Sequence, residues 1–190
     1  MFLNAKEIPF LNQLLSSKEK VFAEYETAQR TEPALQHFLN SAAPEFTNHT
    51  KYWLHENNLD AHQTGYDLRT GIWGAFPLYK KGFPVKWYPV EVRFPYLSDF
   101  FRKNERIEFA CFMRLEAGKS VEPHTHARQH LIFHLLMNEL GGKGCEFTCG
   151  NEKTSLIHKG DFLLFDYSQS HGSHNFANED RVNLVIDLKL

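Results

Sequence analysis

From about residue 71 onward, the sequence is divided into short apolar or alternating runs separated by turn residues. Several short runs bounded by glycine in this way predict a sandwich, barrel or jelly roll of β-strands. The high phenylalanine count, 17 of 190 residues, favours the same class, because aromatic side chains suit pleated, half-buried surfaces. We expect the strands at residues 76–79, 85–92, 107–115, 130–137, 145–149, 154–158, 162–165 and 182–188.

Helices are expected mainly before these strands. Residues 8–28 carry apolar side chains at the i, i+3, i+4 spacing of an amphipathic helix, with a break near Ser16 and Ser17. A second helix is expected over residues 33–40, where Pro33 suits a first turn. One more helix, at residues 96–103, interrupts the strand series.

The length fits one domain, 1–190, with a helical N-terminal part at 1–45 and a β core at 71–190. The net charge of -2 gives no basic field that would recruit nucleic acid. No run approaches the ~20 apolar residues of a membrane span, so no integral membrane segment is expected. Three cysteines and the lack of a signal-peptide pattern favour a reducing cytoplasm. No sequence feature defines an oligomeric state.

Two strands alternate clearly enough to assign their faces. On the last strand, Arg181 lies on the side opposite to the apolar series, so it faces either water or a polar cavity. On the strand at 130–137, His130 and His134 share one face with Ile132. Buried imidazoles require polar partners, so this face is expected to border a polar pocket.

Three histidines suggest a metal site. His124 and His126 project to the same side if the chain is extended there, and His171 follows at a later strand end. A jelly roll presents two histidines and a carboxylate to non-haem iron in this pattern, but here His126 occupies the carboxylate position. The site therefore has three histidines, or two completed by solvent or a co-substrate. In a chain with 11 histidines, such a pair also arises by chance on surface loops.

The stretches PHTHARQHLIFHL and GDFLLFDYSQSHGSHNFANEDRVNLVID resemble the aspartyl/asparaginyl β-hydroxylase family of Fe(II)- and 2-oxoglutarate-dependent oxygenases. The upstream segment from Trp73 to Gly82 is also similar to the family's W-x-x-F-x-L-W-x-x-G, so the resemblance covers roughly residues 70–190. The matching positions are Gly118, Pro123-His124, His134-Leu135, Gly160, Phe165-Asp166, Ser168, His171, Arg181 and Ile186-Asp187.

The resemblance implies a mainly β fold, the double-stranded β-helix (a cupin-like jelly roll), flanked by N-terminal helices. It implies Fe(II) bound by His124 and His171. It also implies that Arg181 binds a carboxylate of 2-oxoglutarate, in a pocket lined by Trp73 and His134.

The chain departs from the family pattern at three positions. Ile132 replaces an arginine, Met113 replaces a hydroxyl-bearing residue, and His126 replaces a glycine, with a segment one residue shorter before His134. Arg128 or His130 compensates for the lost arginine, or the protein uses a different oxo-acid, or none.

Two functions therefore stay open. One is hydroxylation of an unactivated C–H bond in an amino-acid side chain, peptide, protein or small molecule. The other is a metal-binding jelly roll without 2-oxoglutarate, either a three-histidine dioxygenase or a non-catalytic binding module. Asp166 and Asp187 are candidates for hydrogen bonds that support the site. The segments 41–70 and 83–96 are expected to face the substrate.

Overall fold

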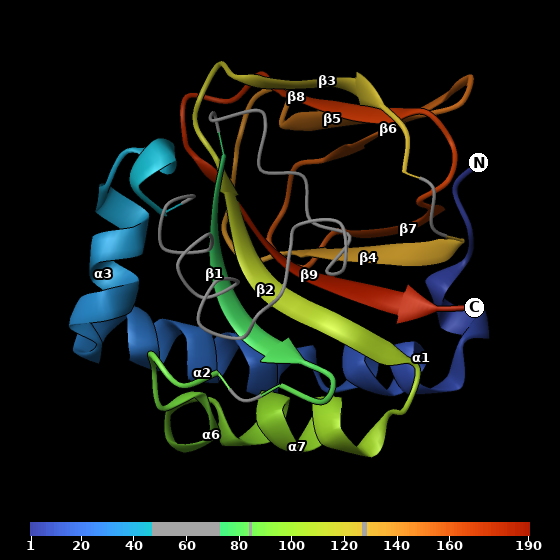
Figure 1. Cartoon of the computed structure of the whole chain (residues 1–190). Coiled ribbons are helices and arrows are strands. Elements are labelled where there is room, and N and C mark those ends of the chain that lie inside the picture. The colour runs from blue at the N-terminus through green and yellow to red at the C-terminus, as the bar shows by residue number, and fades with distance from the viewer. Residues whose placement is uncertain (47–72, 84, 127–128) are drawn as a thin grey trace.

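The computed structural model of the chain describes residues 1–46, 73–83, 85–126 and 129–190 (Figure 1). Most of the surface connection expected at 41–70 lies outside these residues. The strands form a five-stranded and a four-stranded sheet. Figure 1 shows them as two layers, with the helices as a third layer on the outer side of the five-stranded sheet.

The N-terminal helices form where the apolar spacing predicts them. The chain begins with a 3-10 turn η1 (Ala5–Glu7), and α1 (Pro9–Ser16) and α2 (Lys18–Thr31) are separated at Ser17, as expected. Helix α3 (Pro33–Asn40) begins at a proline, whose missing N–H is not needed in a first turn. None of the helices in the described part of the chain is long and apolar enough to cross a membrane.

The strands form two antiparallel sheets. The first has the order β1-β2-β9-β4-β7, and the second has the order β3-β8-β5-β6. From β2 to β9 the chain passes repeatedly from one sheet to the other, which is the winding of a double-stranded β-helix. The mainly β fold with flanking helices is therefore confirmed. The strands are β1 (Trp73–Lys80), β2 (Ile107–Leu115), β3 (Ser120–His124), β4 (His130–Leu136), β5 (Cys145–Cys149), β6 (Glu152–Leu156), β7 (Phe162–Asp166), β8 (His171–Asn175) and β9 (Arg181–Lys189).

The alternation along β9 separates two apolar cores. Val182, Leu184, Ile186 and Leu188 face the core between the five-stranded sheet and the helices, whereas Val185 faces the core between the two sheets. Strand β4 is divided in the same way, with Ile132 and Leu136 on the inter-sheet side. Arg181, His134 and Asp187 therefore point into the space between the sheets, where the pocket described below lies.

One strand prediction was wrong. Residues 85–92 end in a short helix, α6 (Val90–Arg93), which is followed by α7 (Pro95–Lys103). Proline cannot donate to a strand ladder, and Pro89 instead stands at the start of α6. Conversely, β8 was not anticipated, because its sequence HGSHN lacks the apolar residues that mark a strand.

Candidate metal centre and ligand pocket

His124 and His171 are partners on neighbouring strands of the four-stranded sheet. Between Val121 and His124 the register shifts, since three steps along β3 match two steps along β8. A bulge of this kind re-aims a side chain, and here it sets His124 opposite His171. A Cβ atom at Gly172 would lie 2.8 Å from the carbonyl oxygen of Val121, so the close approach of β3 depends on this glycine.

The hydrogen bonds of both histidines leave one ring nitrogen free for a metal. His124 Nδ1 donates to the carbonyl of Glu122 at 2.8 Å, and His171 Nδ1 donates to the carbonyl of Gln169 at 2.7 Å. Because a carbonyl only accepts, Nε2 carries the lone pair in each neutral ring. Burial lowers the pKa of His171 to about 4, which keeps it in the neutral, metal-binding form at neutral pH.

His126 completes a cluster of three histidines. One potential ligand atom from each of His124, His126 and His171 lies within 4.8 Å of the others. The His126 ring stacks on Tyr167 with a centroid distance of 3.7 Å and an interplanar angle of 9°, which holds it beside the other two. The cluster therefore fits a transition metal with imidazole ligands.

The turn before His171 is held by Asp166. Its Oδ1 accepts from the backbone nitrogen of Ser168 at 2.9 Å and from the Ser168 hydroxyl at 2.7 Å. Burial acts to raise the pKa of Asp166, but these hydrogen bonds outweigh it, and the pKa is lowered overall. The carboxylate expected near the site thus fixes the turn that delivers His171.

Arg181 is a buried cation in the same pocket. Only 1% of its surface is exposed, and its Nη1 donates to Ser173 Oγ at 3.1 Å and to Cys145 Sγ at 3.4 Å. Its guanidinium lies 4.9 Å from the centre of the Phe147 ring. No acidic side chain among the described residues pairs with it. Because arginine stays charged in proteins, this arrangement favours an anionic ligand.

His134 lies beside Arg181 and is 5% exposed. Burial, followed by the charges of Arg181 and His171, lowers the pKa of His134 well below its ordinary value. Asn183 Nδ2 donates to His134 Nδ1 at 2.9 Å, so the proton of this neutral ring is on Nε2. His134 is therefore a neutral hydrogen-bond donor.

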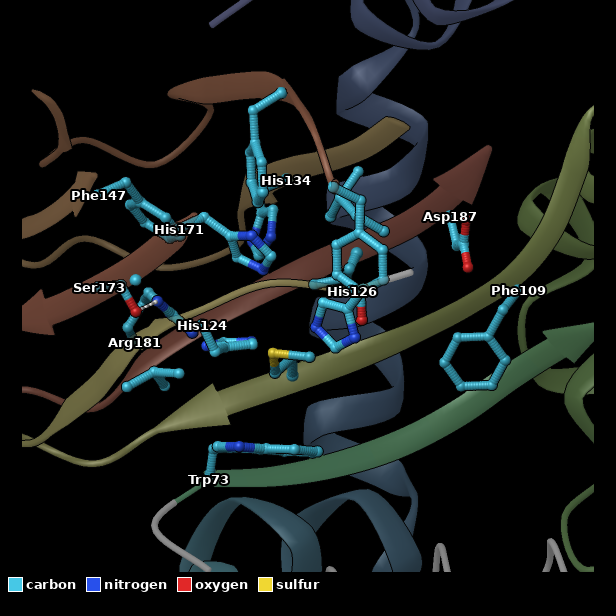
Figure 2. A pocket seen from close by; sticks show the side chains of 17 residues that line it. Trp73, Phe109, His124, His126, His134, Phe147, His171, Ser173, Arg181 and Asp187 are labelled. Atoms are coloured by element: carbon cyan, nitrogen blue, oxygen red, sulfur yellow. Dashed lines mark hydrogen bonds between the residues drawn. The ribbon is translucent and has the colours of Figure 1, made fainter. Parts of the chain in front are cut away.

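These groups line one pocket between the sheets, which Figure 2 shows. Its empty space is about 770 Å³ when the part open to solvent is included. Trp73 forms part of one wall, and Phe109, Met113, Ile132 and Val185 are among its apolar lining. Asp187 is the only acidic residue and Arg181 the only lysine or arginine among the described lining residues.

Most residues expected at the site thus lie together. His124, His126, His171, Arg181, Trp73 and His134 all line the pocket. His130 does not line it, but its Nδ1 lies 2.6 Å from Oδ1 of Asp187, which does. Arg128 lies outside the described residues.

The sequence reasoning missed Ser173 and Phe147. Alternation from His171 along β8 would have placed Ser173 on the same face. The expectation that residues 83–96 face the substrate was wrong for their buried aromatic side chains. Tyr88 and Phe94 belong to the core beneath the five-stranded sheet, and the Tyr88 ring lies 5.1 Å from that of Phe76.

The fold and the three histidines define a class of protein: a double-stranded β-helix with a candidate metal centre between its sheets. The family model described as aspartyl/asparaginyl beta-hydroxylase matches residues 11–189, and the chain belongs to this family of hydroxylase-type oxygenases.

Solved structures with the same kind of fold share little sequence with the chain. The cupin domain of an XRE family transcriptional regulator from Enterobacter cloacae is 10% identical, with a TM-score of 0.43, over 63% of this chain and 98% of that one. A predicted oxalate decarboxylase from Thermotoga maritima is 20% identical, with a TM-score of 0.39, over 47% and 72%. No curated protein matches the chain.

Proposed function

We propose that this protein is an Fe(II)- and 2-oxoglutarate-dependent oxygenase that hydroxylates an unactivated C–H bond of an amino-acid side chain, a peptide or a small molecule. The observation that carries the proposal is one pocket that contains both the three-histidine cluster and the buried Arg181, which pairs with no acidic side chain among the described residues.

The histidine cluster suits Fe(II). Imidazole is a good ligand for iron, so the three histidines would hold the ion, which would still be able to bind a chelating oxo-acid and oxygen. When bound, the iron and the oxo-acid supply the oxidising chemistry, while the chain positions the reactants and excludes water. His126 thus takes the position that a carboxylate has in the two-histidine, one-carboxylate arrangement.

The polar groups near Arg181 suit the far carboxylate of 2-oxoglutarate. The planar guanidinium matches a carboxylate with two parallel hydrogen bonds. Ser173 accepts from Arg181, so its own hydroxyl proton is available to a ligand. It can thereby supply the hydroxyl that Met113 does not. His134 offers a neutral N–H on the same side of the pocket.

A second function is a metal-dependent protein that does not use 2-oxoglutarate. It is favoured by Ile132 and Met113, which line the pocket where the family carries an arginine and a hydroxyl, and by His126 as a third ligand. Such a protein would be a three-histidine dioxygenase or a binding module.

Anaerobic titration with Fe(II) and 2-oxoglutarate separates the two functions. The proposal expects a weak visible charge-transfer band, and succinate after oxygen is admitted. His171→Ala should prevent metal loading, whereas His158→Ala, which changes an exposed histidine, should not. Stoichiometric metal binding without the band and without succinate would overturn the proposal in favour of the second function.

A further inference from the structure

Asp187 and Arg181 lie at opposite ends of the pocket. Both belong to β9 and point toward the same side of the sheet. Figure 2 shows Arg181 on one side, Asp187 on the other, and the histidines between them.

The separation along the strand assigns the two ends to different ligands. The two positions are six residues apart along the strand, and at about 3.3 Å per residue this is roughly 20 Å. A five-carbon dicarboxylate held by Arg181 and the histidine cluster is much shorter than this distance. The Asp187 end therefore remains available to the substrate.

The Asp187 end is an acceptor site with apolar walls. The side chain is buried, with 4% of the residue exposed, and only Oδ1 is bonded, to His130 Nδ1 at 2.6 Å. Its second oxygen makes no hydrogen bond to any residue that the structure describes. Phe109 and Ile132, the strand partners of Asp187, line the same pocket. A carboxylate in such surroundings gains most from a cationic hydrogen-bond donor.

We propose that Asp187, supported by His130, binds a cationic group of the substrate, an alkylammonium or alkylguanidinium whose chain lies along the apolar wall. This inference rests on the proposed function, since it names the substrate class of the same pocket. Arg181 would thus select an anionic co-substrate and Asp187 a cationic substrate, which keeps the two ligands from exchanging places.

The test compares hexylguanidinium with hexylurea, which have nearly the same shape and differ in charge. Binding of each is measured by calorimetry to metal-free protein and to Zn(II)-loaded protein with 2-oxoglutarate. The cation should bind about tenfold more tightly or better, as expected for a charged hydrogen bond. Equal affinity for the two probes would overturn the proposal.

Three variants separate ligand binding from a structural role of the His130–Asp187 pair. Asp187→Asn should abolish the preference for the cation, whereas His130→Phe should keep it. The matched control Asp99→Asn, in an exposed ion pair on α7, should also keep it. If His130→Phe and Asp187→Asn lose the preference equally, the pair is only structural and the proposal fails. If Asp187→Asn does not fold, Asp187→Glu should fold and retain the preference, and its loss there would count against the proposal.

The outcome is distinguishable from a failure of the proposed function. Absence of the Fe(II)–2-oxoglutarate band together with a retained cation preference would overturn the oxygenase but support the Asp187 site. The band without the preference would support the oxygenase and overturn the Asp187 site.

Discussion

Replacing Arg181 by methionine should have opposite effects on ligand binding and on stability. Arg181 is 1% exposed, and the hydrogen-bond partners of its guanidinium are the neutral groups Ser173 Oγ and Cys145 Sγ. In the ligand-free protein, a buried cation without a counter-ion destabilises the fold. With 2-oxoglutarate bound, the same cation becomes half of a buried charged pair.

The expected magnitudes follow from this difference. Losing one partner of a buried charged pair costs about 2–5 kcal/mol, so Arg181→Met should weaken 2-oxoglutarate binding roughly thirtyfold to several thousandfold. An apolar residue of similar volume in place of a buried ion is often neutral or stabilising by about 1–4 kcal/mol. Part of that gain is lost because Ser173 and Cys145 lose a donor. The free energy of unfolding without ligand should therefore stay the same or rise.

Arg114 provides the matched control, because it is also buried, on the neighbouring strand, but lies beside an acidic side chain. Its Nη1 donates to the carbonyls of Phe38, at 2.7 Å, and Ser41, and its Nε lies 2.8 Å from a carboxylate oxygen of Asp180. Arg114→Met should cost about 3–5 kcal/mol of unfolding free energy and leave 2-oxoglutarate affinity unchanged.

Urea unfolding of ligand-free protein and calorimetric titration of 2-oxoglutarate into Zn(II)-loaded protein measure the two effects. If Arg181→Met destabilises the fold as much as Arg114→Met and keeps its affinity for 2-oxoglutarate, Arg181 is a structural residue. The assignment of an anion site to this end of the pocket would then be refuted.

Three further results are expected. His126→Ala should weaken Zn(II) binding by about a hundredfold, since each ligand of a structural zinc site contributes roughly 3 kcal/mol. A chelator competition assay measures this, with His158→Ala as the control. If the two variants bind Zn(II) equally tightly, His126 is not a ligand. The pKa of His171 is about 4 in the folded protein and about 6.5 in the unfolded chain, so between these pH values only the unfolded chain is protonated at this residue. The metal-free protein should therefore lose up to roughly 3 kcal/mol of unfolding free energy as the pH falls from about 6.5 to about 4. Urea unfolding across that range checks this, and an unchanged slope in His171→Gln would contradict it. Gly172→Ala places a methyl group 2.8 Å from the Val121 carbonyl oxygen, so it should lower the free energy of unfolding by about 1–3 kcal/mol and weaken metal binding by displacing β3. Unchanged stability together with normal metal affinity would refute this steric explanation.

Sequence patterns predicted helices and strands correctly where one face of the element is apolar and the other is polar. The helix break at Ser17, the bounds of α3 and the two faces of β9 all follow from spacing in the sequence. Prediction failed at residues 85–92, whose apolar and aromatic side chains pack as a turn and short helix rather than a strand. Prediction also failed at β8, because this strand carries polar residues that line the pocket and lacks the apolar alternation that marks a strand.

The candidate site was also predicted from the sequence only in part. Spacing and family resemblance identified His124, His171 and Arg181, because imidazole and guanidinium reveal their chemistry by residue type alone. The contact between Asp187 and His130 is formed across β4 and β9, 57 residues apart, and no local pattern encodes which acceptor meets which donor.

The sequence by itself determined the kind of fold, the family and the residue types available for metal and anion binding, because these depend on periodicity and on side-chain chemistry. Only the tertiary structure decided that the β3 bulge and Gly172 set His124 opposite His171, and that His126 joins them. It also decided that Arg181 is buried with no acidic partner in the part of the chain that the structure describes. The reason is physical: register, close approach and burial arise from packing between strands distant in sequence, and they determine which charges remain uncompensated.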